Sequence, residues 1–481
     1  MPPYLALWHR RFVALPPRRS LPVTLFFDRG AAPPLRRIIR AAWPADAREA
    51  RSSALYVAAL INNVLCVHGA ASVTLFSENG VLAERLRDEA HRLLFMRLRP
   101  FSDMPFGFLR GLSRQVFGRD FRLEAAPGNA PAPGREPPVP MGTPPPAPRP
   151  GLVLAVNIGQ HLTSLALVRV DGEGRFSLEG LTRRKSAPCG EEASLAAILA
   201  AVRDEARSLA REARPGIDAL AISLAATTYR GKVLAVPGYG LFPEDCPAGE
   251  AATALARFCG DVAPGGPFDV LNDGLAQAVF AHRHGGAPVG DMLSVRLGSS
   301  PAVHRLDASG RAAPGFHEYG WLVTRFAPPN DTGRLFSSIR PYLSHYGAAA
   351  VAHELGLLGK YGLGIDEAPA FFRDALDADL PLLRQDAEHV YGILGAHLAM
   401  FAHELHRDRP LATIRLLGSR TSRLDAATFR VMAAGFAAFA AGHGLDLEAL
   451  ELTLIEEASA VAGLVGAAHV ALEAAPQAGR G

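Results

Sequence analysis

The stretch 152-LVLAVNIGQHLTSLALVRVDGEGR-175 decides the fold class of this chain. An apolar run ends at Asn157 and a glycine-containing turn, and a second apolar run then leads to an Asp-Gly pair. Apolar runs of strand length that are separated by turn residues predict a β-hairpin. We therefore expect strands at 152–157 and 163–170.

Segments with alternating strand and helix patterns follow this hairpin as far as residue 475. Expected strands lie at 218–224, 268–271, 291–297, 413–418 and 451–455; expected helices lie at 191–213, 249–259, 274–284, 425–443 and 456–475, with mostly helical sequence over 347–406. The last helix has small residues on most of its faces, which requires close packing against its neighbours. This alternation predicts an α/β architecture.

A proline-rich segment separates this part of the chain from the first part. Eleven of the 24 residues in 127-PGNAPAPGREPPVPMGTPPPAPRP-150 are proline. Proline removes backbone donors and fixes φ, so neither a helix nor a sheet can persist there. We therefore divide the chain into an N-terminal module at 1–126, a linker at 127–150, a large domain at 151–475 and a flexible tail at 476–481.

Charge is unevenly distributed between the two parts. Residues 1–127 contain nineteen arginines, no lysine and ten acidic residues, a balance of +9, whereas residues 151–481 come to −7. A basic module joined to an acidic domain suggests an anionic partner, for which nucleic acid is the leading candidate. The alternative is that arginine simply replaces lysine, because the whole chain has only three lysines.

The sequence shows no sign of secretion, of a disulfide framework or of a zinc knuckle. The four cysteines have neither CxxC nor Cys/His spacing; they are Cys66, Cys189, Cys246 and Cys259. No apolar run reaches the roughly 18 residues that span a bilayer. In MPPYLALWHRRF the basic residues follow the apolar ones, which is the wrong order for a signal peptide. We expect a cytoplasmic protein that does not enter a membrane.

Six segments, in the correct order, resemble the ROK family, which contains bacterial sugar kinases and sugar-responsive transcriptional repressors. They are the hairpin at 152–172, the sugar-side segment at 218–240, the catalytic-aspartate segment at 268–287, the phosphate-2 segment at 291–300, the sugar-binding Gly-Glu-x-Gly-His element at 310–323, and the adenosine-side strand at 412–422 with the terminal helix. This resemblance covers about 151–475. It implies an actin-like (ribonuclease H-like) α/β fold with two lobes around a cleft, here preceded by a smaller α+β module, and it favours a homodimer.

The resemblance also implies roles for single residues. Asp273 matches the base that accepts the proton of the sugar hydroxyl, because phosphoryl transfer to a sugar needs a carboxylate within reach of that hydroxyl. Its alternative role is the N-cap of a helix that starts at Gly274. Asn272 and Glu318 match sugar-contacting positions, as does Asp273. The phosphate-side positions are Asn157, Gly159, Gly298 and Ser299, and the adenosine-side position is Gly418.

The nucleotide side departs from the family pattern more than the sugar side does. Asn157 replaces an aspartate whose charge would help to hold hydrated Mg²⁺. Gln160 replaces a glycine that lets the backbone approach phosphate, and Pro301 removes an amide donor beside Ser299. Trp321 replaces the zinc-binding histidine of the family, so we expect no structural zinc. ATP and Mg²⁺ are expected only if the chain is a kinase.

The N-terminal module has two interpretations. Residues 53–94 can be laid over the winged helix-turn-helix of the repressors, although the second helix would turn acidic residues towards DNA. Alternatively, the module is a degenerate partial copy of 386–455, used for dimerisation or docking. That copy would consist of a helix at 47–66, a strand at 72–76, helices at 80–98 and 105–117, and a strand at 120–125.

Three functions are therefore weighed. The first is a sugar-responsive transcriptional regulator with a non-catalytic kinase domain, which binds a carbohydrate at Asn272, Asp273 and Glu318 and DNA through residues 1–126. The second is a divergent ATP-dependent hexose or N-acetylhexosamine kinase that uses Asp273. The third is a pseudoenzyme scaffold that binds no sugar. The changes at Asn157 and at Ser299–Val303 favour the first function over the second.

Overall fold

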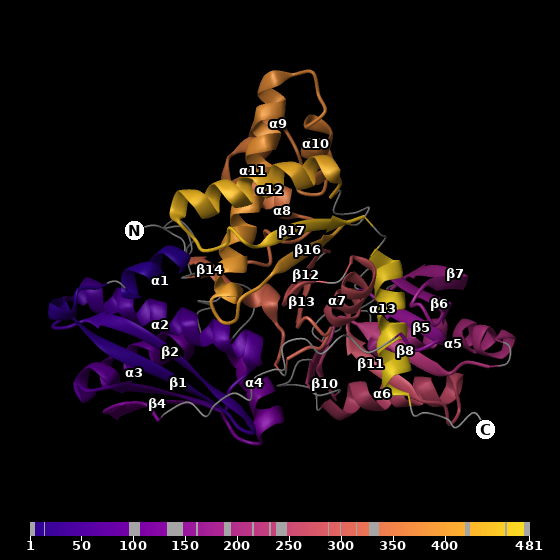
Figure 1. Ribbon diagram of the computed structural model, residues 1–481, viewed down its shortest axis with the longest axis horizontal. Coiled ribbons are helices and arrows are strands. Elements are labelled where there is room, and N and C mark those ends of the chain that lie inside the picture. Colours follow the sequence, from indigo (N-terminus) through magenta and orange to yellow (C-terminus); the bar gives the residue numbers. More distant parts are fainter. Residues whose placement is uncertain are drawn as a thin grey trace.

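The computed structural model describes residues 5–475 apart from 14, 96–105, 132–147, 160–161, 187–193, 214–215, 230–231, 237–247, 287, 299, 314, 327–335, 419–423 and 457–458. Most of the predicted linker and the whole predicted tail at 476–481 therefore lie outside the described residues. Three bodies are visible: the N-terminal module at lower left, a first lobe at lower right and a second lobe above them (Figure 1).

The N-terminal module is a four-stranded sheet in the order β2-β1-β3-β4. The strands are β1 (Ser20–Arg29), β2 (Ala32–Ala42), β3 (Ser72–Ser77) and β4 (Arg122–Pro127); the helices are α1 (Leu5–Val13), η1 (Pro17–Arg19), α2 (Ala47–His68), α3 (Gly80–Phe95) and α4 (Phe106–Phe117). In β1, Val23, Leu25 and Phe27 are fully buried and alternate with more exposed residues. One face of the sheet therefore carries the core. The elements expected from 47 onward are present, whereas the β1–β2 hairpin and α1 were not predicted.

The helix-turn-helix interpretation of this module fails on strand topology. The strand β3 lies between α2 and α3 in sequence and pairs with β1 on one side and β4 on the other. A central strand at this position rules out the helix-turn-helix layout over 53–94. The partial-copy interpretation agrees with the strand pairing, because β3 and β4 run parallel, as do the corresponding strands at 413–417 and 451–455.

The first lobe is a five-stranded sheet in the order β11-β8-β5-β6-β7. Its strands are β5 (Gly151–Ile158), β6 (Leu162–Val170), β7 (Phe176–Lys185), β8 (Ala219–Leu224) and β11 (Phe268–Asn272), with the small pair β9 (Thr227–Tyr229) and β10 (Lys232–Ala235) beside it. The predicted hairpin is confirmed, since β5 and β6 pair antiparallel. Leu154 and Val156 of β5 face the helices α5 (Leu195–Glu212) and α6 (Ala248–Val262). Val153 and Ala155 face the opposite side.

The second lobe is a four-stranded sheet in the order β13-β12-β16-β17. The strands are β12 (Met292–Leu297), β13 (Pro301–Leu306), β16 (Thr413–Leu417) and β17 (Glu451–Ile455); β14 (Val323–Phe326) and β15 (Phe336–Ser338) form a separate pair. The helices are η3 (Tyr319–Trp321), α8 (Gly347–Glu354), α9 (Leu357–Tyr361), α10 (Ala368–Ala375), α11 (Pro381–His406) and α12 (Ala426–His443). β12 pairs parallel with β16, and β16 pairs parallel with β17.

Two helices, α7 (Asp273–His284) and α13 (Ser459–Ala474), lie between the two sheets. They approach so closely that a Cβ atom on Gly466 would lie 1.7 Å from the carbonyl oxygen of Ala276. The expected tight packing of the small-residue terminal helix is therefore confirmed. The lobes meet across this helix pair, as expected for the two-lobed actin-like fold.

The N-terminal module and the second lobe share one continuous apolar core. The helix α1 contacts β14 and α11, and α2 contacts η3 and β14. Within this core Phe12 stacks on Tyr56 with ring centroids 4.7 Å apart. The module is thus built into the second lobe. α2 is long and apolar enough to cross a membrane by composition, but 83% of its apolar window is buried inside the protein.

Candidate functional site

The polar side chain near the end of β5 is bonded within the protein. Asn157 is only 7% exposed, and its Oδ1 accepts a hydrogen bond of 3.1 Å from the hydroxyl of Ser223 on β8. A Cβ atom on Gly463 of α13 would lie 2.5 Å from the same oxygen. The side chain of Asn157 therefore joins β5 to β8 underneath α13.

The glycine amides at the predicted nucleotide side also have internal partners. The amide of Gly159 donates to the carbonyl oxygen of Leu162 at 2.9 Å, that of Gly298 to the carbonyl oxygen of Arg296 at 3.2 Å, and that of Gly418 to the carbonyl oxygen of Ile455 at 3.2 Å. Backbone amides that hold phosphate must point freely at the ligand. Ser299, the remaining predicted phosphate contact, lies outside the described residues.

At the sugar side, β11 leads directly into α7 and places Asn272 and Asp273 at the junction. Asn272 is the N-cap: its Oδ1 accepts from the amide of Leu275 at 3.2 Å, and its Nδ2 donates to the carbonyl oxygen of Ala226 at 2.7 Å. The alternative role predicted for Asp273 is therefore wrong by one residue. Because Asn272 caps the helix, the carboxylate of Asp273 is not the cap. It accepts a hydrogen bond from the amide of Gly274 at 3.0 Å.

Glu318 lies close enough to Asp273 for their charges to interact. The hydroxyl of Thr227 donates to the carboxylate of Glu318. Burial raises the pKa of Glu318 to about 7; the charge of Asp273 adds to this rise, and the hydrogen bond from Thr227 opposes it. Burial also raises the pKa of Asp273. The structure thus brings together Asp273 and Glu318, two of the three predicted sugar contacts. The third, Asn272, directly precedes Asp273 in the chain.

Two arginines that the sequence did not single out face these carboxylates. The guanidinium of Arg296 opposes the rise in the Asp273 pKa, and burial lowers the pKa of Arg296 itself. Arg340 likewise opposes the rise in the pKa of Glu318. Its guanidinium lies 4.7 Å from the ring centroid of Trp321. Trp321 thus packs under a cation at the position of the family's zinc-binding histidine. Neither arginine carries a local signal of function in the sequence, because tertiary packing brings each of them to its carboxylate.

The C-terminal end of α2 is bonded directly to the sugar-side element. The amide of Glu318 donates to the carbonyl oxygen of Cys66 at 2.9 Å, and the amide of His317 donates to that of Val67 at 3.2 Å. Helix C-termini have carbonyl groups without intrahelical partners, and this element supplies those partners. A Cβ atom on Gly315 would lie 2.2 Å from the carbonyl oxygen of Val67, so only glycine fits there.

Asn63 of α2 adds a second link to the same region. Its Nδ2 donates to the carbonyl oxygen of Val323 at 2.9 Å, and its Oδ1 accepts from the Val323 amide at 2.8 Å. Asn63 is 6% exposed and Val323 is 1% exposed. The asparagine side chain therefore pairs with β14 in the way that a neighbouring strand would.

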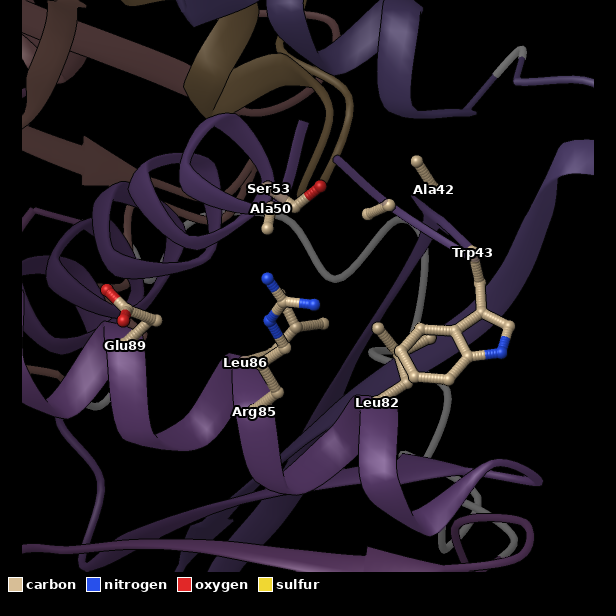
Figure 2. A pocket seen from close by; sticks show the side chains of 9 residues that line it. Ala42, Trp43, Ala50, Ser53, Leu82, Arg85, Leu86 and Glu89 are labelled. Carbon is tan, nitrogen blue, oxygen red and sulfur yellow. The ribbon is translucent and has the colours of Figure 1, made fainter. Parts of the chain in front are cut away.

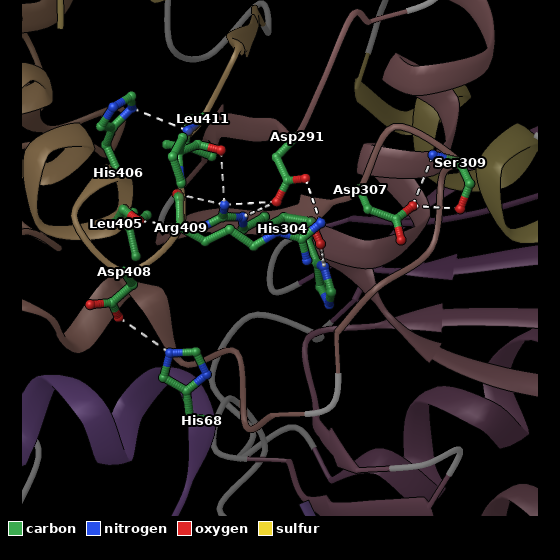
Figure 3. A network of polar contacts seen from close by, with 12 residues as sticks. His68, Asp291, His304, Asp307, Ser309, Leu405, His406, Asp408, Arg409 and Leu411 are labelled. Carbon is green, nitrogen blue, oxygen red and sulfur yellow. Dashed lines mark hydrogen bonds and ion pairs between the residues drawn. The ribbon is translucent and has the colours of Figure 1, made fainter. Parts of the chain in front are cut away.

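A polar network continues this interface towards the end of α11 (Figure 3). Asp408 forms an ion pair with Arg37 of β2 and a hydrogen bond with His68, whose Nε2 is 3.3 Å from its Oδ2. Burial raises the pKa of Asp408, but Arg37 and His68 outweigh it and bring that pKa below its ordinary value. Nearby, Asp291 pairs with Arg305 and Arg409, both at 2.7 Å. Charged groups thus fix the N-terminal module to the second lobe.

No protein-family model and no curated protein matches the chain. Among solved structures, a protein from Cytophaga hutchinsonii ATCC 33406 classed as a sugar kinase has 16% identity and a TM-score of 0.50, over 66% of this chain and 99% of that chain. A ROK family glucokinase from Streptomyces griseus, solved with glucose and AMPPNP, has 19% identity and a TM-score of 0.49, over 67% and 100%. A ROK family transcriptional regulator, a homolog of the E. coli MLC protein, has 15% identity and a TM-score of 0.46, over 67% and 78%.

The chain has the sugar-kinase fold of the Cytophaga structure. At these identities the likeness shows the fold alone. Almost the whole Cytophaga protein has a counterpart here, whereas about a third of this chain has none in that protein. Across the described part of this fold and of the N-terminal module, no group of three or more His, Cys, Asp or Glu side chains is arranged to hold a metal ion.

Outside the ROK fold, much of the arginine charge of the N-terminal module is bonded within the protein. Ion pairs join Arg37 to Asp408, Arg87 to Asp88, Arg92 to Glu89, Arg114 to Asp120 and Arg119 to Asp28. Arg40 donates to Ser20. Such pairing reduces the charge that the module can offer to an anionic partner.

Three exposed arginines of the module lie in or next to a hollow between α2, α3 and the end of β2 (Figure 2). The hollow is lined by Trp43, Leu82 and Leu86, with Arg85 reaching across it. Arg48 and Arg51 are exposed on the first turns of α2, next to Ala50 in the lining. We define Arg48, Arg51 and Arg85 as the arginine face of the module.

Proposed function

We propose that this protein is a carbohydrate-responsive transcriptional regulator in which the ROK fold binds ligand without transferring phosphate. The observation that carries the proposal is the bonding of α2 to the sugar-side element through the amides of His317 and Glu318. A ligand that contacts the Glu318 carboxylate acts on a residue whose own backbone holds the N-terminal module.

The residues on the nucleotide side do not fit a magnesium–ATP complex. The amides of Gly159, Gly298 and Gly418 already donate to carbonyl groups, and Asn157 is bonded to Ser223 beneath a helix. Phosphoryl transfer depends on positioned donors and charge around the phosphates.

Ligand binding can reach the N-terminal module because the module and the second lobe share one core. His317 has φ of 57°, a backbone conformation that residues other than glycine rarely adopt. It is held there by its bond to Val67 and by the contact of its Nδ1 with the hydroxyl of Tyr319 at 3.1 Å. A shift of this element on ligand binding must move or release the end of α2.

The first experiment separates regulator from kinase. The full-length protein is incubated with Mg-ATP and either D-glucose or N-acetyl-D-glucosamine, and hydrogen exchange is followed in parallel with and without sugar. We expect no sugar phosphate, and a change in amide protection at 60–68 and 315–323 but not in α5. Turnover in the ordinary kinase range of about 1–100 s⁻¹, abolished by Asp273→Asn, would overturn the proposal.

The second experiment tests the DNA output through the arginine face. The full-length chain is titrated with duplex DNA over a salt series, because the module shares its core with the second lobe and cannot be tested alone. Phosphate contacts make log K fall linearly with log salt. We expect the double variant Arg48→Gln/Arg51→Gln to reduce that slope by about 2. If wild-type protein does not bind duplex at low salt, the transcriptional part of the proposal is wrong, and a protein partner becomes the output.

A further inference from the structure

Arg296 is placed by strand alternation on the face of β12 that looks towards α7 and the cleft. In β12 the side chains of Leu293, Val295 and Leu297 belong to the core of the second lobe. Met292, on the opposite face, belongs to the core around α7 and α13. Arg296 shares that face with Met292 because successive side chains of a strand alternate. It is the last residue of the face before the turn at Gly298.

Two other arginines of the same sheet show what a structural arginine looks like in this protein. Arg305 of β13 bonds to Asp291 and to the carbonyl oxygens of Leu405, Arg409 and Pro410. Arg415 of β16 donates to the carbonyl oxygens of Ala281 and Gly286 at the end of α7. Both guanidinium groups therefore have internal acceptors.

Arg296 has no such acceptors among the described residues. Its Nε is buried without a hydrogen-bond partner there, as that of Arg415 is, but Arg296 lacks the bonds that the terminal nitrogens of Arg415 make. Its Cζ would lie 3.5 Å from a Cβ atom on Gly298, so the guanidinium stands beside the phosphate-2 turn. A buried donor without a partner is costly, and a charged donor more so. A ligand that supplies the missing acceptor would recover that cost.

The surrounding charges favour an anion as that acceptor. Arg296 and Arg340 are both cations, whereas burial raises the pKa of Glu318 to about 7, so that its carboxyl group is partly protonated at neutral pH. Guanidinium groups bind phosphate and carboxylate groups through paired, charge-assisted hydrogen bonds.

We propose that the ligand of the cleft is a carbohydrate that carries an anionic group, phosphate or carboxylate, and that this group binds to Arg296. The sugar ring would then lie towards Glu318 and Thr227. This inference rests on the proposed function, since it specifies the class of carbohydrate to which the regulator responds.

The test is calorimetric binding of D-glucose, D-glucose 6-phosphate, D-glucuronate and inorganic phosphate to wild-type protein, Arg296→Gln and Arg296→Lys. Arg311→Gln, at an exposed position, is the matched control. We expect wild-type and control protein to bind at least one anionic sugar about 10- to 100-fold more tightly than glucose. Arg296→Gln should remove that preference with unchanged circular dichroism, and Arg296→Lys should restore part of it. The anionic sugar that wild-type protein binds more tightly, D-glucose 6-phosphate or D-glucuronate, shows whether the anionic group is a phosphate or a carboxylate.

Two results would overturn the inference and leave the regulator proposal standing: glucose binding as tightly as both anionic sugars, or Arg296→Gln leaving their preference intact. Inorganic phosphate binding as tightly as glucose 6-phosphate would also overturn it, since the site would then recognise an anion and not a sugar. If no carbohydrate, neutral or anionic, binds to the wild-type protein, the proposed function itself falls.

Discussion

At the nucleotide end of the cleft the polar groups are bonded to the protein itself, whereas at the sugar end charged side chains face one another and are tied to a separate module. Asn157 and the amide of Gly159 are examples of the first kind. Glu318 and Arg296 are examples of the second. The two ends of one cleft can therefore lose and keep ligand-binding potential independently.

Under the proposed function, the phosphate site has been lost without damage to the fold. An amide that once had a ligand as its acceptor needs another acceptor when it becomes buried. Here the turn closes on itself and supplies that acceptor. At the sugar end, the guanidinium of Arg296 has no comparable acceptor within the described residues. A ligand can therefore still supply that acceptor.

The largest effect on stability is expected from Asn63→Ala, which removes the side chain that bonds the N-terminal module to β14. The substitution leaves the buried amide and carbonyl of Val323 without partners, at about 1–3 kcal/mol for each group. We expect the free energy of unfolding to fall by about 3 kcal/mol, measured by chemical denaturation. Asn62→Ala is the control, because the Nδ2 of Asn62 donates to the carbonyl oxygen of Trp321 at 3.3 Å and to the sulfur of Cys66 at 3.6 Å, and neither bond involves Val323. Equal losses in the two variants would contradict the pairing described for Asn63.

An intermediate effect is expected at the nucleotide end from Asn157→Asp, which restores the acid of the family pattern. The carboxylate would be buried against Ser223 and α13, where it cannot be well solvated. We expect a loss of about 2 kcal/mol in thermal or chemical denaturation and no gain of phosphoryl transfer from Mg-ATP. Asn157→Ala should cost less, about 1 kcal/mol, because it removes one hydrogen bond without burying a charge. A variant with aspartate that is as stable as wild type and active would show that the turn still accepts a nucleotide.

The smallest effect is expected from Glu318→Gln, seen in the pH dependence of stability. The folded-state pKa of Glu318 is about 7, above its model-compound value of 4.5, so folding favours the protonated acid. Its contribution is fully present below pH 4.5 and is lost as pH rises through about 7. We expect wild-type protein to lose about 1 kcal/mol between pH 6 and 8, and the glutamine variant to lose less. The exposed Glu173→Gln should behave as wild type; an unchanged slope in Glu318→Gln would place the titration elsewhere.

Much of the ROK fold could be predicted from the sequence because its elements are long and apolar. The runs 152–157 and 163–170 became a hairpin, and the small-residue helix near the end of the chain packs as its composition requires. The β1–β2 hairpin was missed: 32-APPLRRIIRAA-42 places two prolines and three arginines in a strand. Such residues are tolerated there because β2 lies at the edge of its sheet.

The candidate site was less predictable than the fold. Asn272 and Asp273 could be placed at a strand end from the local pattern alone, but the one-residue shift of the cap depends on backbone geometry. Arg296 and Thr227 carry no local signal of function; they matter because separate strands bring them to Asp273 and Glu318. Nor could the bonding of α2 to the sugar-side element be predicted, since it joins residues 66–67 to 317–318 and depends entirely on tertiary packing.

The near-contact of Gly466 with Ala276 has a consequence for how the protein is made. The inner face of the first lobe, with Val153 and Ala155, is covered by α13, which is synthesised long after β5. The N-terminal module likewise packs against α11, which is synthesised long after it. Neither core can be completed before these distant helices have been made, so the nascent protein exposes apolar surface until then, a state in which a chaperone would help to prevent aggregation.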